Sequence, residues 1–459
     1  MRQARLRDFL RLRCCGLLAT AAATIWRPRP APAPPRCLFN SNVSGLGRAR
    51  GHFSQVLLSI TLASCCVWYS PSSATADPAT RVRVQDLSGQ TQSGKLVEIS
   101  PSKIQITTES AIDWKRADVL RIDWMPLPET LLDETPQLLL ANGDRLGLRP
   151  QSIAAESLVG KWERFPAWPE VAVPLETLRG AMLLPPRNPL ERSQMIVRLR
   201  DQRETQDLFY LSNGDRLLGQ LESLGKDAFE LTAATAPISV PVATVRGFGM
   251  NPELTSFPPA TGSQALLALS DGSQLTVGDV VFSDKTGLSC RAAFGAELHF
   301  PAEHLVSLQF LGGRIVFLSD LEPQAFVSTP YLARSWPLRR NQNAVGGPLR
   351  LGGKEYARGL GQHSQSLATY NLNHKYLAFQ ATIGVDAVTE GRGSVIFRLL
   401  ADGKPVFTSD VVRGKTPAIV IGPLSMKNVE QLTLAVDFAD QGDLLDHADW
   451  CDALLIKAN

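Results

Sequence analysis

The segment LLLANGDRLGL, residues 138–148, decides the fold of most of this chain. Apolar residues alternate with other residues on both sides of the pair Asn142 and Gly143. A two-residue turn between antiparallel strands needs positive φ angles, which Asn and Gly adopt most readily. The segment therefore predicts a β-hairpin.

Related segments recur along the first two thirds of the chain. They are LFYLSNGDRLLGQL (208–221), LLALSDGSQLTVGDV (266–280) and a weaker copy, VQDLSGQTQSGKLVEI (84–99). Each copy is followed by an ending such as VAVPLETLRGAML (171–183), which predicts a strand, a short turn of helix begun by Pro, and a closing strand. The spacing between copies varies, so degenerate repeats fit better than a solenoid of fixed period.

Each repeat unit should form four or five short antiparallel strands. This pattern resembles small SH3-like or Sm-like barrels. The alternative is that the hairpins belong to one larger β-domain. No combination of residues in these units suggests a chemical role.

After about residue 316 the chain changes to longer strands without further copies of the repeat. SVIFRLL (394–400) and LTLAVDF (432–438) alternate as half-buried strands do, and ADGK (401–404) is typical of a hairpin turn. Short strands with turn signals and no amphipathic helix predict a β-sandwich.

The order of the C-terminal motifs resembles the NPCBM family. The motifs are GGPLRLGGKEYARGLGQHSQSLATYNL (346–372), YLAFQATIGVD (376–386), GSVIFRLLADGKPVFTSDVV (393–412), VEQLTLAVDFA (429–439) and DHADWCDALL (446–455). The resemblance implies a carbohydrate-binding module with a galactose-binding-like, jelly-roll sandwich, of a kind often attached to glycoside hydrolases. It implies nothing about the residues before 316.

The predicted fold is therefore all-β, with degenerate small β-units followed by a sandwich. Pro-rich and Gly-rich stretches at 185–194 and 251–263 mark linkers between units. The predicted organisation is an N-terminal extension with signal peptide (1–76), four β-repeat units (77–125, 126–185, 195–255 and 260–315) and the NPCBM-like sandwich (316–459).

The N-terminal segment predicts export. An apolar stretch from Val56 to Tyr69 follows basic residues, and Ala74 and Ala76 form a cleavage motif. The stretch is about 14 residues long, whereas a transmembrane helix needs about 20, so we expect no membrane span. The motif LASC ending at Cys65 offers the alternative of a lipid anchor. The expected location is periplasmic, cell-surface or extracellular.

The charge distribution argues against nucleic acid as a partner. Residues 1–76 hold ten Arg and one acidic residue, which leaves 37 basic and 43 acidic residues in the rest of the chain. A net charge of −6 does not provide the basic surface that nucleic acids require. Only Cys290 and Cys451 lie outside the presequence, and no CxxC pair is present. A disulfide between those two is not expected, since they fall in different predicted units.

Five residues are candidates for contacts with a glycan. His363 follows two glycines in GLGQHS, which predicts a loop, and Asp446 and His447 lie in the turn before the last strand. Loops at one end of a sandwich cluster in space, so these residues could meet there. Trp336 or Tyr356 would supply the ring that packs against a sugar. Structural roles for the histidines and the turn carboxylates remain the alternative.

Asp449 and Asp452 are candidate ligands for calcium, which prefers carboxylate and carbonyl oxygens. In the other interpretation, aspartates of this segment satisfy N–H groups of a turn while Trp450 points into the core. Catalysis is not expected, because two carboxylates would need to face each other across a substrate.

The sequence thus predicts an exported, non-catalytic protein that binds glycans, galactose-type or other oligosaccharides, through its C-terminal module. One alternative is a glycoside hydrolase in which the module targets the substrate. Another is a structural or adhesion protein of the cell envelope.

Overall fold

The structure is a computed structural model that describes residues 80–126, 135–234, 236–259, 262–331, 335–440 and 442–458. Nearly all regular structure in these ranges is β-strand, and α1 (Pro189–Arg200) is their one α-helix, so the all-β prediction is confirmed. No helix within the described ranges combines the length and the apolar character needed to cross a membrane. The predicted signal peptide, its cleavage motif and Cys65 lie outside the described residues.

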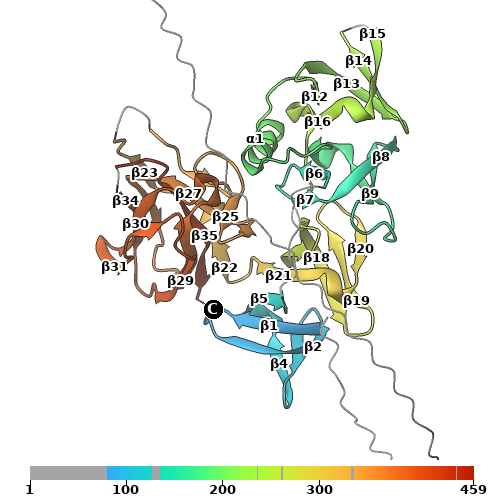
Figure 1. Cartoon of the computed structure of the whole chain (residues 1–459). Helices are drawn as coiled ribbons and strands as arrows, with labels where there is room; N and C mark the ends of the chain where they lie inside the picture. Colours follow the sequence, from blue (N-terminus) through green and yellow to red (C-terminus); the bar gives the residue numbers. More distant parts are fainter. Residues whose placement is uncertain are drawn as a thin grey trace, which may run out of the picture. The chain divides into compact units, whose positions relative to one another are not determined.

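Four copies of one strand pattern fill the region before the sandwich (Figure 1). In each copy the first strand pairs with both the second and the last strand. The first copy contains β1 (Arg81–Asp86), β2 (Thr91–Ile99), β3 (Lys103–Thr107), β4 (Ala111–Lys115) and β5 (Val119–Trp124). The second contains β6 (Gln137–Leu140), β7 (Arg145–Leu146), β8 (Leu148–Ala154), β9 (Ser157–Trp162), β10 (Val171–Pro174) and β11 (Leu178–Met182).

The third and fourth copies repeat this order. The third contains β12 (Asp207–Leu211), β13 (Arg216–Leu224), β14 (Ala228–Ala233), β15 (Ala236–Pro241) and β16 (Val245–Gly249). The fourth contains β17 (Gln264–Leu269), β18 (Gln274–Ser283), β19 (Gly287–Ala292), β20 (Glu297–Phe300) and β21 (Leu305–Leu311). The expected positive φ angles are present at the hairpin turns, for example 94° at Gly143 and 93° at Gly214.

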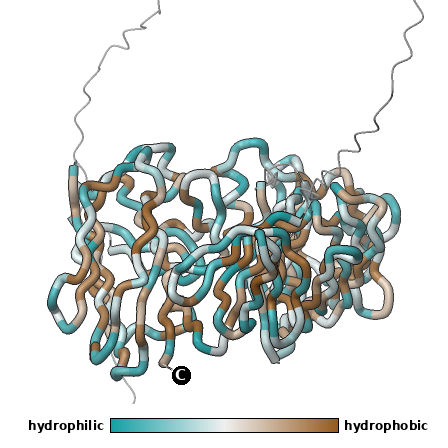
Figure 2. The backbone as a smooth tube through the Cα atoms, turned by 90° about the horizontal axis from the view of Figure 1, so that it is seen from below, coloured by the Kyte–Doolittle hydropathy of each residue, from teal (hydrophilic) through white to brown (hydrophobic). Residues whose placement is uncertain are grey.

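The closing strands join the copies to one another. Single turns of 3-10 helix follow Pro174, Pro241 and Pro301, as the repeated endings predict, and each leads into a closing strand. The closing strand β5 pairs with β21, and the closing strand β11 pairs with β16. One hydrophobic cluster consequently runs through all four copies. Hydrophobic and hydrophilic stretches alternate along the backbone of the protein (Figure 2).

Helix α1 begins within the segment predicted as a linker. Asn188 accepts hydrogen bonds from the backbone N–H groups of Leu190 and Glu191 at 2.8 and 3.2 Å, which caps the first turn. Pro189 occupies the first helical position, where a missing N–H costs nothing. Buried apolar side chains of the helix, such as Leu199, pack on β6 and β11. The Pro-rich stretch is thus partly a helix start.

The C-terminal region is a two-sheet sandwich, as predicted (Figure 1). The first sheet has the order β24 (Arg339–Arg340), β27 (Gly359–His363), β35 (His447–Lys457), β29 (Tyr376–Val385) and β33 (Ile419–Ser425), with β22 (Ile315–Phe317) also paired to β35. The second has the order β23 (Ala325–Ser328), β28 (Ser366–Asn371), β34 (Gln431–Phe438), β30 (Ser394–Ala401) and β31 (Lys404–Thr408), with β32 (Val412–Arg413) also paired to β30. A separate hairpin comprises β25 (Leu349–Leu351) and β26 (Lys354–Tyr356).

Strand β35 is buried on both faces. Trp450 is fully buried in the sandwich core, where its ring lies 5.1 Å from that of Phe397, which confirms the core interpretation. On the other face, Leu454 and Ile456 join the hydrophobic cluster of the repeats. Cys451 packs with the β25–β26 hairpin and is a free thiol. The last strand therefore links the sandwich to the repeat copies.

Candidate functional site

Three of the predicted ligand-binding residues meet at one end of the sandwich. The rings of Trp336 and His363 stack with centroids 4.4 Å apart and an angle of 7° between their planes. The His447 ring lies edge-on, 5.3 Å from each of the other two. These residues, which we call the ring cluster, are far apart in sequence.

Strand register brings the two histidines together. His363 is the last residue of β27, His447 is the first residue of β35, and they are direct partners across the two antiparallel strands. Side chains in that position lie about 5 Å apart. His363 was predicted in a glycine-rich loop, but it is a strand residue with only 3% of its surface exposed. Its Nδ1 lies 2.9 Å from the carbonyl oxygen of Ser364, so this nitrogen donates the hydrogen bond.

Trp336 is the more accessible member of the ring cluster. It is half-buried, whereas both histidines are buried. The stacked His363 ring supports one face of the indole. Trp336 can therefore offer ring surface to a ligand while His363 fixes its orientation.

Asp446 stabilises the loops beside the ring cluster. It is fully buried and accepts hydrogen bonds from the hydroxyl of Ser364 at 2.6 Å and from the backbone N–H of Ser394 at 2.9 Å. Burial raises the pKa of Asp446 to about 6, although these two hydrogen bonds favour the charged form. Asp446 consequently acts on the site by positioning its neighbours.

A cavity of about 410 Å³ adjoins His447. Helix α1 forms one wall, with Leu190 and Val197 among its lining residues, and Glu390, Arg392 and Leu445 contribute on the sandwich side. Ligand pockets have volumes of roughly 300–1,000 Å³ and combine apolar walls with a few polar groups. This cavity has the size and lining for a small polar ligand.

The structure does not bring Tyr356 to the ring cluster. Tyr356 packs in a small apolar cluster with Leu349, Leu351 and Cys451, and the Lys354 ammonium lies 4.6 Å from its ring centroid. Burial raises the pKa of Tyr356 far above its ordinary value. Tyr356 lines a different pocket, which is described below.

The two candidate calcium ligands have different neighbours. Burial, and next the nearby carboxylate of Asp386, raise the pKa of Asp449 well above its ordinary value, which disfavours the charged form that calcium would bind. Asp452 lies 3.9 Å from the guanidinium of Arg121 in the first repeat copy. Within the described ranges, no group of three or more His, Cys, Asp or Glu side chains is arranged to hold a metal ion.

Sequence patterns did not single out several residues of this site. Ser364 and Ser394 bind the two oxygens of Asp446, and Glu390 and Arg392 line the cavity. Ser364 is adjacent to His363, which was a usable signal. The other three residues belong to β30 and to the turn before it, and nothing in the sequence shows that this turn packs against β35.

The fold and the site define an all-β protein whose C-terminal region is a sandwich with a cavity beside His447. More particularly, residues 314–456 match the profile described as the NPCBM/NEW2 domain, so the C-terminal sandwich is an NPCBM/NEW2 domain. This confirms the resemblance inferred from the sequence motifs.

Two curated relatives match parts of the chain. A protein of Renibacterium salmoninarum that carries the name of an endo-alpha-N-acetylgalactosaminidase is 32% identical over 145 residues, which are 30% of this chain and 9% of that protein. An alpha-1,3-galactosidase B of Akkermansia muciniphila is 34% identical over 107 residues, which are 23% of this chain and 13% of that protein. The matched segment spans only a small part of either relative.

Solved structures with similarity to the chain include two from Clostridium perfringens. One is CBM51 from GH95 in complex with methyl-galactose, at 24% identity, with 31% of this chain and 99% of that chain covered and a TM-score of 0.28. The other is CBM51-2 with GlcNAc and INT domains from ZmpB, at 24% identity, with 39% and 43% covered and a TM-score of 0.29.

Proposed function

We propose that this protein is an exported, non-catalytic glycan-binding protein whose NPCBM/NEW2 domain holds the sugar. The observation that carries this proposal is the ring cluster beside the 410 Å³ cavity at one end of the sandwich. The two curated relatives carry the names of glycosidases for galactose-type sugars, and these names support a glycan as the ligand.

The chemistry of the site suits a sugar. Sugars present an apolar ring face and a rim of hydroxyl groups, so their sites combine aromatic rings with polar side chains. Trp336 supplies a ring that His363 supports from behind. His447, Glu390 and Arg392 supply donors and acceptors around the cavity. Asp446 holds the surrounding backbone and needs no contact with the ligand.

Binding is tested by titrating the full chain with methyl galactoside, N-acetylgalactosamine and N-acetylglucosamine in a calorimeter. Trp336→Ala and His447→Gln should each weaken binding by roughly 10-fold or more, because each removes a ring or a hydrogen bond from the site. His374→Gln is the matched control, since His374 is exposed and pairs with Glu430 elsewhere on the sandwich. Melting temperatures of all variants should stay close to that of the wild type.

Two results would count against the proposal. One is that none of the sugars, nor a broader glycan array, binds the wild type. The other is that Trp336→Ala and His447→Gln bind as tightly as the His374→Gln control. A large loss of melting temperature without a change in affinity would assign the ring cluster a structural role instead.

The non-catalytic part is tested with the same sugars linked as oligosaccharides. We expect no release of reducing ends over long incubation. Release that is sensitive to substitutions in the repeat region would favour the glycoside hydrolase alternative.

Export is tested on the native protein. The mature chain should begin near Asp77, after the motif at Ala74 and Ala76. N-terminal sequencing or intact mass gives the answer. A mature start at Cys65 with a lipid mass would replace the secreted form with the anchored one.

A further inference from the structure

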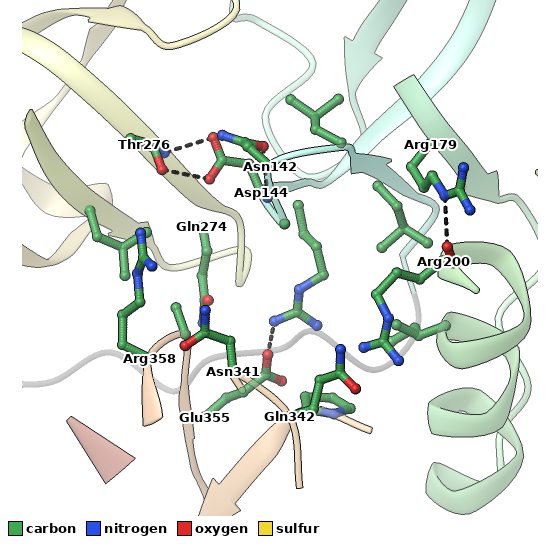
Figure 3. A pocket seen from close by; sticks show the side chains of 18 of the residues that line it. Asn142, Asp144, Arg179, Arg200, Gln274, Thr276, Asn341, Gln342, Glu355 and Arg358 are labelled. Carbon is green, nitrogen blue, oxygen red and sulfur yellow. Dashed lines mark hydrogen bonds and ion pairs between the residues drawn. The ribbon is translucent and has the colours of Figure 1, made fainter. Parts of the chain in front are cut away.

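A second pocket, of about 250 Å³, lies where the second repeat copy, helix α1 and the sandwich come together (Figure 3). The turn 141–145 between β6 and β7 forms one side, and Arg179 and Arg200 lie on another. Residues 340–342 and 355–358 of the sandwich complete it. The glycan site proposed above shares none of these residues.

Positive groups outnumber negative groups around this pocket. Its lining includes five guanidinium groups and only two carboxyl groups, Asp144 and Glu355. The guanidinium groups belong to Arg145, Arg179, Arg200, Arg340 and Arg358. Both oxygens of Asp144 already accept hydrogen bonds from Thr276, and burial raises the pKa of this carboxyl above its ordinary value.

Three of the five arginines are neutralised by carboxylates outside the pocket. Arg200 pairs with Asp201, Arg340 with Glu322 and Arg358 with Asp320, at 2.6–2.8 Å. Arg179 instead donates to the backbone carbonyls of Arg200 and Gln202. The remaining positive charge is therefore on Arg179, which donates to carbonyls, and on Arg145, which has only a share of the Glu355 carboxylate.

Arg145 is the buried member of this group of arginines. Its side chain is only 8% exposed, and it shares the single carboxylate of Glu355 with Arg350. Burial, and next the like charge of Arg350, lower the pKa of Arg145. Within the described part of the chain, its Nη1 is buried and has no hydrogen-bond partner. A buried guanidinium N–H without an acceptor is costly, and an incoming anion would supply that acceptor.

Neutral polar groups surround the charged ones. Asn142, Gln274, Asn341 and Gln342, which carry side-chain amides, also line the pocket (Figure 3). The side-chain oxygen of Gln342 is also buried and lacks a hydrogen-bond donor among the described residues. Amides of this kind bind hydroxyl groups through paired donors and acceptors. The pocket thus offers contacts for a ligand that has both an anionic group and hydroxyl groups.

We propose that this pocket binds the anionic group of an acidic saccharide, a hexuronic acid or a sulfated sugar, with Arg145 as the main contact. Its volume of about 250 Å³ lies just below the usual range of ligand pockets, so the ligand group it holds is small. The saccharide part of this inference rests on the proposed glycan-binding function, whereas the anion part follows from the pocket alone.

The test compares D-galacturonic acid with D-galactose, which differ only at C6, a carboxylate in the acid and a hydroxymethyl group in galactose. In calorimetric titrations at low salt, the full chain should bind galacturonate at least 10-fold more tightly than galactose in a site that Arg145→Gln removes. Binding should weaken when sodium chloride is raised from 50 to 500 mM, because salt screens the charges.

Arg216→Gln is the matched control, because Arg216 occupies the same place in an identical Asn-Gly-Asp-Arg turn but is exposed. Arg340→Gln provides a second variant at the same pocket that leaves the buried Arg145–Glu355 pair intact, and it should weaken galacturonate binding several-fold. His447→Gln should leave galacturonate binding unchanged, which separates this site from the ring cluster.

Several outcomes would overturn the inference. They are equal binding of galacturonate and galactose, galacturonate binding that Arg145→Gln leaves intact in a folded protein, and loss of galacturonate binding in His447→Gln. The last result would place the acidic sugar at the ring cluster and leave the proposed function standing. If sodium acetate and sodium sulfate bind as tightly as galacturonate and D-galactose 6-sulfate, the ligand is a simple anion and the saccharide is refuted.

Discussion

The same four residues, Asn-Gly-Asp-Arg, form hairpin turns at 142–145 and at 213–216. Their local structures are nearly identical. Gly143 and Gly214 have φ angles of 94° and 93°. In both turns the aspartate N–H donates to the asparagine side chain, at 3.1 and 3.0 Å. Four residues are thus enough to determine the backbone of the turn.

The surroundings of the two turns differ completely. Asp144 is buried and accepts hydrogen bonds from the N–H and the hydroxyl of Thr276 in the fourth copy, both at 2.8 Å. Asp215 is exposed, and its carboxylate accepts a hydrogen bond from the side chain of Asn213 in the same turn. Arg145 pairs with Glu355 of the sandwich, whereas Arg216 lies 5.7 Å from the ring of Tyr210 in its own hairpin. The tetrapeptide does not encode its packing partners. Contacts with the fourth copy and the sandwich place the turn 142–145, but not the turn 213–216, at a pocket.

The largest expected effect is at Glu355, whose carboxylate pairs with Arg145 of the buried turn. Glu355→Gln leaves the guanidinium groups of Arg145 and Arg350 without their shared negative partner in a buried setting. Breaking a buried ion pair on one side costs about 3–5 kcal/mol of unfolding free energy. Tyr210→Leu, which removes the ring beside Arg216, should cost below about 1 kcal/mol. Urea denaturation of both variants measures the difference.

Equal losses in the two variants would break the comparison, because they would mean that burial adds nothing to the Arg145 pair. The exposed pair of Arg413 and Asp440 gives a further reference, and Asp440→Asn should change stability by less than about 1 kcal/mol.

The next effect concerns the two aspartates. Asp144→Ala removes the acceptor for the buried N–H and hydroxyl of Thr276 and should cost about 2–3 kcal/mol. Asp215→Ala removes an exposed acceptor and should stay within about 0.5 kcal/mol. Thermal and urea unfolding of both proteins test this. A cost at position 215 that matches the cost at 144 would show that the turn itself, rather than the contact with β18, needs the carboxylate.

The sequence predicted what depends on short segments. The hairpins, the 3-10 turns after proline and the strands of the sandwich, such as 376–386, follow from residue types and alternation. Pairing between copies, as in β5 with β21, depends on packing of whole sheets, and no pattern of turn or strand residues reports it. Helix α1 was missed because its starting proline was interpreted only as a linker signal.

The candidate site shows the same division. Sequence reasoning selected Trp336, His363 and His447, and strand register brings the two histidines together. It also selected Tyr356, which belongs to the β25–β26 hairpin and packs in a different hydrophobic cluster. The pocket around Arg145 could not be predicted, since an identical tetrapeptide at 213–216 is exposed.

A smaller effect should be the same in both turns. Gly143→Ala and Gly214→Ala place a side chain in a left-handed backbone conformation, which costs about 1–2 kcal/mol. An added Cβ at either position would meet no other atom within 4 Å, so local strain is the only expected cost. Stability measurements should give equal losses within error. Unequal losses would mean that the residues packed around each turn change the stability cost of the added side chain.

The smallest expected effect is a change in the pH dependence of stability. Burial raises the pKa of Asp144 in the folded protein above its ordinary value near 3.8. The folded state therefore holds a proton that the unfolded state has lost, and stability falls as the pH rises from that ordinary value through the folded pKa. Asp144→Asn resembles the protonated acid and can keep both contacts with Thr276, since the hydroxyl can accept as well as donate. The variant should match the wild type at pH 4 and melt at a higher temperature at pH 8, whereas Asp215→Asn should follow the wild type at both. A variant that melts lower than the wild type at pH 8 would mean that Asp144 is needed as a carboxylate, through its hydrogen bonds from Thr276 or its attraction to the arginines of the pocket.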